Sequence, residues 1–301
     1  MTRREKSDKL FMKTQKGEMA LTIDRIRIEV GAAKPFRALH MTDNHLALAD
    51  LRDGQRKVDL AVKRRAAFNE GQGFAEALLE EQLSYARERG LLVLHTGDLI
   101  DFVSLKNLEY AQKALGDIDY FMAAGNHEFS LYVGEAFEDV PYKMQSYDLV
   151  QGYFRNNLLF DSRVVNGVNF VAVDDGYYRF DQGQLARMKV EVAKGLPIVL
   201  MLHNPLHTDA LYEAMMKVHP CAYLTGTPDH MTAVYDDYRL RQQRPDEDTL
   251  AFIDYVYGQP LIRAVLAGHL HRSWIGPLPS GITQYVGDAG YHAAAREIEF
   301  V

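Results

Sequence analysis

The sequence predicts an α/β (α+β) protein in which mixed β-sheets are flanked by helices, and three observations support that fold class. Apolar runs of strand length recur along the chain, and several end abruptly in polar residues. Helical segments separate some of these runs, and such strand–helix–strand units favour parallel pairing. Asn166-Gly167 joins the apolar segments 158–165 and 168–173 and suits the type I′ turn of an antiparallel hairpin.

Composition sets the broad class. The chain has 301 residues, 47% hydrophobic and 25% charged, as in a globular protein with a sizeable core. The net charge of −7 disfavours nucleic acid as the main partner, although a local basic patch remains compatible with it. Cys221 is the one cysteine in the sequence, which excludes an intramolecular disulfide and fits a reducing compartment. With no apolar segment long enough for a signal peptide or a bilayer span, we expect a cytoplasmic protein without membrane contact.

The N-terminal part is predicted to lead into the first sheet. Residues 1–18 are polar, and we expect a loosely ordered tail there. Residues 21–30 alternate apolar and polar side chains with one slip of phase at Asp24 and Arg25, which predicts a strand with a bulge. A second strand is expected over 36–42.

Helices are expected to cover this sheet. A basic segment over 57–65, interpreted as a solvated helix face, precedes a helix over 74–86 that Gly90 closes. A further helix over 104–115 has Ser104 as its N-cap.

The stretch 91–101 is the centre of the pattern. Its apolar run is a buried strand, and Gly97 lets the backbone turn so that Asp98 projects from the carboxyl end. Open α/β sheets place their chemistry at that end. Segment 129–154 lacks clear periodicity and leaves directly from His127, so we expect it to lie over the site.

The second half of the chain supplies another sheet and an insertion. A helix over 182–194 leads to a strand that ends at His203, and short strands after Trp274 complete the sheet. The insertion 206–259, with helices over 211–219 and 246–257, is either a cap or a subunit interface. Because candidate ligands come from both ends of the chain, we predict a single domain over 1–301.

Five of the apolar runs end in side chains that bind metal ions. In chain order these ends are Asp43-Asn44-His45, Gly97-Asp98 with Asp101, Gly125-Asn126-His127-Glu128, His203, and Gly268-His269-Leu270-His271. This order of motifs resembles the signature of the calcineurin-like metallophosphoesterase family. Each motif alone is common, but five in order, each at a strand end, are specific. The resemblance spans residues 43–271 and implies a two-sheet mixed β-sandwich flanked by helices, in four layers.

The resemblance also implies a dinuclear metal site. Asp98 would bridge two divalent ions, and the mixed imidazole, amide and carboxylate ligands fit Mn, Fe or Zn. The implied ligands of the first ion are Asp43, His45, Asp98 and His271. Those of the second are Asp98, Asn126, His203 and His269. Residues two apart in an extended segment point the same way, which would let Asp43 and His45 share one ion.

The resemblance assigns catalytic roles to two further residues. His127 would protonate the leaving oxygen or stabilise the transition state while a metal-bridging hydroxide attacks. Asp101 would orient His127 and favour its protonated form.

Departures from two branches of the family narrow the function. Phe102-Val103 stands where Ser/Thr protein phosphatases have Arg-Gly, and Asp101 stands where purple acid phosphatases have a metal-binding Tyr. We therefore predict a metal-dependent phosphoesterase acting on a small phosphorylated substrate, with a diester such as a cyclic nucleotide slightly preferred. The alternatives are a small-molecule phosphomonoesterase and a non-catalytic scaffold. The sequence sets no oligomeric state.

Two groups of residues are weaker candidates. Those placed to contact substrate are Asp175, Tyr177, Tyr178, Asn204, His207, Thr227, His230 and Tyr235. Those interpreted as structural are His40, His95, His219 and His292.

Overall fold

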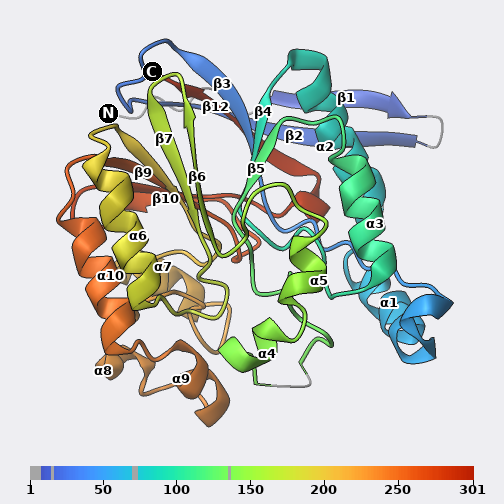
Figure 1. Cartoon of the computed structure of the whole chain (residues 1–301). Helices are drawn as coiled ribbons and strands as arrows, with labels where there is room; N and C mark the ends of the chain where they lie inside the picture. The colour runs from blue at the N-terminus through green and yellow to red at the C-terminus, as the bar shows by residue number, and fades with distance from the viewer. Residues whose placement is uncertain (1–7, 15–16, 70–73, 135–136) are drawn as a thin grey trace.

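The computed structural model describes residues 8–14, 17–69, 74–134 and 137–301 (Figure 1). Within them two six-stranded sheets pack face to face. The first sheet has, in spatial order, β1 Asp8–Thr14, β2 Gly17–Ile28, β12 Ala294–Phe300, β3 Phe36–Met41, β4 Leu92–His95 and β5 Tyr120–Met122. The second has β10 Trp274–Pro277, β11 Thr283–Val286, β9 Ile262–Ala267, β8 Ile198–Met201, β7 Val168–Val173 and β6 Phe160–Val165.

Both sheets are mixed. β3, β4 and β5 run parallel in the first sheet, as do β7, β8, β9 and β11 in the second, and antiparallel partners lie beside them. The hairpin of β6 and β7 turns at Asn166 and Gly167, as the sequence predicts. The apolar core between the sheets includes Phe300, whose ring stacks on Phe36 at 5.2 Å between centroids.

Helices cover the two outer faces and one end of the sandwich. Their bounds are α1 Gln55–Ala67, α2 Ala75–Arg89, α3 Leu105–Ala114, α4 Val140–Met144, α5 Tyr147–Gln151, α6 Gln182–Ala193, α7 Asp209–Met216, α8 Asp229–Thr232, α9 Asp237–Gln243 and α10 Glu247–Tyr257. α2 and α3 pack on the first sheet, and α6 and α10 on the second, which completes four layers (Figure 1). The predicted fold class is confirmed. In the described part of the chain, no helix has the length and apolar character that crossing a bilayer requires.

Local capping explains where several helices begin and end. Ser104 accepts a hydrogen bond from the Asn107 amide at the start of α3. Gly90 closes α2 in the left-handed conformation, with φ of 61°. Both caps agree with the predictions from the sequence.

The bulge predicted at Asp24 and Arg25 is wrong. β2 pairs with β12 in unbroken register through both residues. Leu21 and Ile23 pack toward the helices, whereas Ile26 enters the core between the sheets. The slip of phase therefore reflects a change in which face of β2 is buried. The first half of the strand buries the face toward the helices, and the second half buries the face toward the second sheet.

The prediction of a loosely ordered tail over 1–18 is also wrong in part. Residues 8–14 form β1, which pairs antiparallel with β2 from Asp8 opposite Ile23 to Thr14 opposite Gly17. This pairing satisfies backbone groups along the edge of β2, which begins earlier than its apolar pattern indicates. Residues 1–7 and 15–16 of the predicted tail lie outside the described residues.

The segment 206–259 divides into two parts. Its last helix, α10, packs beside α6 on the second sheet, where Phe252 stacks on Phe180 with ring centroids 4.0 Å apart. α10 is therefore part of the sandwich. The preceding helices, α7 to α9, lie at the end of the molecule that also carries α4 (Figure 1).

We expect Phe252→Ala to lower the free energy of unfolding by about 3–5 kcal/mol, because it empties a buried site between α10 and the second sheet. Leu250→Ala, on the same helix but 44% exposed, is the control and should change stability by less than about 0.5 kcal/mol. Urea denaturation measures both. Equal small losses would contradict the packing of α10 as a layer of the fold.

Candidate metal centre

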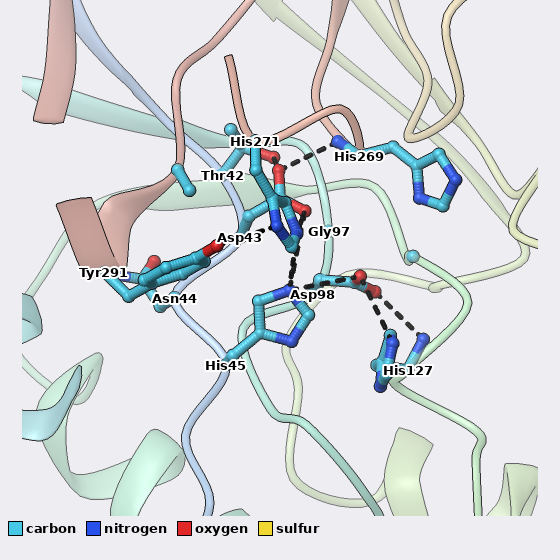
Figure 2. A network of polar contacts seen from close by, with 12 residues as sticks. Thr42, Asp43, Asn44, His45, Gly97, Asp98, His127, His269, His271 and Tyr291 are labelled. Atoms are coloured by element: carbon cyan, nitrogen blue, oxygen red, sulfur yellow. Dashed lines mark hydrogen bonds and ion pairs between the residues drawn. The ribbon is translucent and has the colours of Figure 1, made fainter. Parts of the chain in front are cut away.

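The residues predicted to form the site all follow the carboxyl ends of strands. Asp43 and His45 come after β3, Asp98 after β4, Asn126 and His127 after β5, His203 after β8, and His269 and His271 after β9. Figure 2 shows the side chains of His45 and His271 turned toward each other, with the Asp98 carboxylate beside them. The sequence motifs thus converge in space, including residues more than 200 positions apart.

Five of these residues have left-handed backbone conformations. Asp43 and His45 have φ of 53° and 51°, and Asp98, His269 and His271 have φ between 49° and 68°. The extended geometry predicted for Asp43 and His45 is therefore wrong, although both side chains face the site. Hydrogen bonds hold the strained loop in place: the amides of Asp43 and His45 donate to the carbonyls of Gly97 and Asp98, each at 2.9 Å.

The first cluster contains Asp43, His45 and His271. The Nε2 atoms of the two histidines lie 3.0 Å apart, and His271 Nε2 is 3.3 Å from Asp43 Oδ1. Two nitrogens bound to one ion at about 2.0–2.1 Å lie at a similar separation. These three side chains are the ones the sequence assigned to the first ion besides Asp98.

The second cluster contains Asp98, His203 and His269. His203 Nε2 lies 3.2 Å from Asp98 Oδ2 and 3.1 Å from His269 Nδ1. Asp98 Oδ2 is also 3.7 Å from His45 Nε2 in the first cluster. One carboxylate oxygen therefore faces both clusters, as a bridging ligand must.

The outward-facing nitrogen of each histidine has its own partner. His45 Nδ1 contacts the Asp101 carboxylate at 3.0 Å, and His203 Nδ1 donates to the Thr96 carbonyl at 2.7 Å. His269 Nε2 contacts the Tyr178 hydroxyl at 2.6 Å, and His271 Nδ1 contacts the Tyr291 hydroxyl at 2.9 Å. Such partners orient imidazoles so that the inward nitrogen is free to bind a metal ion.

Two properties of the site indicate whether metal ions fit it: oxygen atoms without a hydrogen-bond donor, and the local charge. Asp43 Oδ1 and Asn126 Oδ1 are buried and accept no hydrogen bond from any described residue. Burial disfavours the charged form of His203, yet Asp98 and Asp43 raise the pKa of His203 to about 10. A hydrogen bond to Asp101 and the nearby carboxylates of Asp43 and Asp98 likewise outweigh burial and raise the pKa of His45 to about 9. The centre attracts positive charge and offers free oxygen ligands, so these residues fit two divalent cations.

Asp101 contacts His127 differently from the expectation. His127 Nδ1 donates to the main-chain carbonyl of Asp101 at 2.6 Å, and the Asp101 carboxylate, which also binds His45 and Arg64, lies 3.4 Å from the same nitrogen. Burial lowers the pKa of His127, and Asp98 and Asp101 oppose this without outweighing it. Asp101 therefore acts on the pKa of His127 in the expected direction, but burial outweighs it, and the proton-donor role of His127 stays a prediction. The other ring nitrogen, Nε2, lies 4.0 Å from Asp98 Oδ2.

Helix α1 contacts the centre through Arg64, which belongs to the basic segment 57–65. The prediction that this segment is only a solvated helix face is therefore wrong for Arg64. Arg64 donates to both carboxylate oxygens of Asp101, at 2.6 and 2.7 Å. Phe68 stacks on the His45 ring with centroids 4.4 Å apart. Arg64 and Phe68 are four residues apart, and this helical spacing is the sequence signal that identifies one inward face.

Two buried carboxylates, whose roles the sequence did not reveal, hold the ligand loops. Glu128 accepts the backbone amides of Asp98 at 2.8 Å and Gly125 at 2.6 Å. Burial and repulsion from Asp98 raise the pKa of Glu128 to about 7. Asp175, a candidate substrate contact, instead accepts the amide of His203 at 2.8 Å.

The remaining candidates have varied positions. Tyr178 contacts His269, and Asn204 donates to the Asp175 carbonyl. His40 and His95 are buried against Thr96 and Asn44, in agreement with a structural role. Tyr291, which contacts His271, follows the last motif and was missed because a lone tyrosine carries no pattern.

Comparison with known proteins agrees with this geometry. A family model described as calcineurin-like phosphoesterase matches residues 36–273. The chain belongs to the calcineurin-like phosphoesterase family. The predicted family and enzyme class are confirmed: this phosphoesterase hydrolyses phosphoric esters, and its family depends on dinuclear metal centres. Among curated proteins, none matches the sequence significantly.

Solved structures with the same fold include two phosphatases. A dimetal phosphatase from Danio rerio is 14% identical, with a TM-score of 0.50, and the alignment covers 85% of this chain and 88% of that one. A purple acid phosphatase from yellow lupin seeds is 12% identical, with a TM-score of 0.50, and the alignment covers 88% of this chain and 46% of that one. At these identities the likeness shows the shared fold.

We expect Glu128→Gln to weaken metal binding by about 10- to 100-fold. The NH₂ group of the new side chain is a donor, so it would face the backbone N–H groups of Asp98 and Gly125 that now donate to the carboxylate. Elemental analysis after dialysis against a buffered Mn²⁺ solution measures the loss. Glu88→Gln, on the exposed end of α2, is the matched control. Full metal content in Glu128→Gln would show that the loop does not depend on this carboxylate.

We expect chelation to lower the melting temperature by several degrees and Mn²⁺ to restore it, since a ligand at 100 times its Kd adds about 2.7 kcal/mol. Asp98→Asn should lose most of this shift. Differential scanning calorimetry of both proteins measures it. A wild-type protein insensitive to chelator and metal would instead support the scaffold interpretation.

Proposed function

We propose that this phosphoesterase hydrolyses a small phosphodiester with two divalent ions and with His127 as general acid. The observation that carries the proposal is that Asp98 Oδ2 faces both ligand clusters while His127 Nε2 lies 4.0 Å from the same oxygen. A scissile group bound between the clusters would therefore lie beside a proton donor.

Each ion would have its own ligands. Asp43, His45, Asp98 and His271 would hold the first, and Asp98, Asn126, His203 and His269 the second. Mn, Fe or Zn suits this nitrogen and oxygen set. Bound there, the ions would supply positive charge to phosphoryl oxygens and lower the pKa of a water molecule.

The protein's own groups position the proton donor. The Asp101 carbonyl fixes His127 Nδ1, and the His127 amide donates to Asp98 Oδ1 at 2.9 Å. Both contacts hold the ring with Nε2 toward the centre, where it can protonate a leaving oxygen. Arg64 holds the Asp101 segment from α1.

The preference for a diester rests on the position after Asp101. Phe102 and Val103 are buried in the core, 0% and 1% exposed, so no arginine binds the phosphoryl group from this position. A monoester carries more negative charge than a diester and needs such a cation more. The buried Cys221 and the net charge of −7 support a small substrate in a reducing compartment such as the cytoplasm.

The test is hydrolysis of bis(p-nitrophenyl) phosphate against p-nitrophenyl phosphate with added Mn²⁺. We expect a higher kcat/KM for the diester, and almost none in a chelated sample or in Asp98→Asn. A higher kcat/KM for the monoester would make the chain a small-molecule phosphomonoesterase. Metal-loaded protein that cleaves neither ester would contradict the proposal.

We expect His127→Ala to lower kcat by about 10²- to 10⁴-fold for an ester with a poor leaving group, such as a phenyl ester. The loss should be smaller for the p-nitrophenyl ester, whose leaving oxygen needs less protonation. Metal content, measured in parallel, should stay at the wild-type level. Equal losses for both esters, or full turnover, would exclude the general-acid role.

A further inference from the structure

Helix α9 places a cation against an aromatic ring that contacts the second ligand cluster. The guanidinium carbon of Arg239 lies 4.9 Å from the centroid of the Tyr223 ring. The Tyr223 ring in turn lies 5.8 Å from the His269 ring, at an interplanar angle of 69°. The Tyr178 ring also packs against the His269 ring, with centroids 5.5 Å apart. Arg239 is therefore one aromatic ring away from a ligand of the second ion.

The charge of Arg239 is held in place but not neutralised. Its Nη1 donates to Gln242 Oε1 at 2.7 Å, and no described carboxylate lies within 4.0 Å of its guanidinium. Two nearby arginines are paired instead: Arg179 lies 3.1 Å from Asp246, and Arg244 lies 2.6 Å from Asp229. Arg239 is half-buried, so water screens its charge less than that of a surface residue.

The segment before α4 contacts helix α9 at two residues. Phe137 contacts Tyr238 of α9 with ring centroids 5.8 Å apart, and Gln242 donates to Glu138 at 3.5 Å. Burial and repulsion from Asp98 raise the pKa of Glu138 to about 7, and Arg239 opposes that rise. Glu138 thus lies within electrostatic range of both the metal centre and the guanidinium.

We propose that Arg239 binds the phosphoryl group of the substrate and sets how well the site accepts a monoester relative to a diester. This inference rests on the proposed function, because it places substrate at the two clusters. A guanidinium matches phosphate oxygens in geometry and charge. The doubly charged monoester gains more from that contact than the singly charged diester.

The test compares Arg239→Gln and Arg239→Lys with wild-type protein on p-nitrophenyl phosphate and bis(p-nitrophenyl) phosphate with Mn²⁺. For Arg239→Gln we expect kcat/KM to fall about 10- to 100-fold for the monoester and less than about 3-fold for the diester. Arg239→Lys keeps the charge and should recover much of the monoester rate. Arg244→Gln, whose arginine pairs with Asp229 on the surface, is the control and should leave the ratio unchanged.

Orthophosphate binding gives a second readout that does not need turnover. Calorimetric titration of Mn²⁺-loaded protein should show affinity for orthophosphate about 10-fold weaker in Arg239→Gln than in wild type. Equal losses for the two esters, or unchanged affinity for orthophosphate, would overturn the inference. If the wild-type protein cleaves neither ester, the proposed function fails, and the orthophosphate titration still decides the role of Arg239.

Discussion

The carboxylate of Asp98 is the constraint on which the rest of the site depends. It follows the carboxyl end of β4, an inner strand of the first sheet, yet its Oδ2 faces imidazoles that come from both sheets. Glu128 fixes the Asp98 amide, and the His127 amide fixes its Oδ1. The face-to-face packing of the two sheets brings His203 to this oxygen, so the sandwich itself assembles the site.

The sequence predicts the fold class, and it places the candidate ligands at one edge of the sheets because each motif stands directly after an apolar strand. Local order along the chain is then enough to place ligands at one edge. It does not reveal what lies behind the ligands. Arg64, Glu128 and Tyr291 act through contacts that join segments distant in sequence, and each residue alone has an ordinary surface or loop interpretation.

Backbone conformation is the second property that the sequence did not predict. The pattern of β2 shows how a slip of phase can mean a change of buried face instead of a bulge, which only the arrangement of the second sheet decides. Likewise, a two-residue spacing between ligands indicates a shared direction but not the conformation that produces it. In both cases the missing information is tertiary, since neighbouring segments select among local conformations of similar energy.

The left-handed conformation of five candidate ligands restricts which residue types these positions tolerate. Asp, Asn, His and Gly tolerate positive φ, whereas β-branched and bulky residues do so rarely. The two residue types at these positions, Asp and His, therefore suit the backbone conformation as well as the proposed metal ions. A descendant that lost catalysis would drift toward Asn or Gly at these sites. The positive φ angles would then remain as a structural trace of the lost metal site.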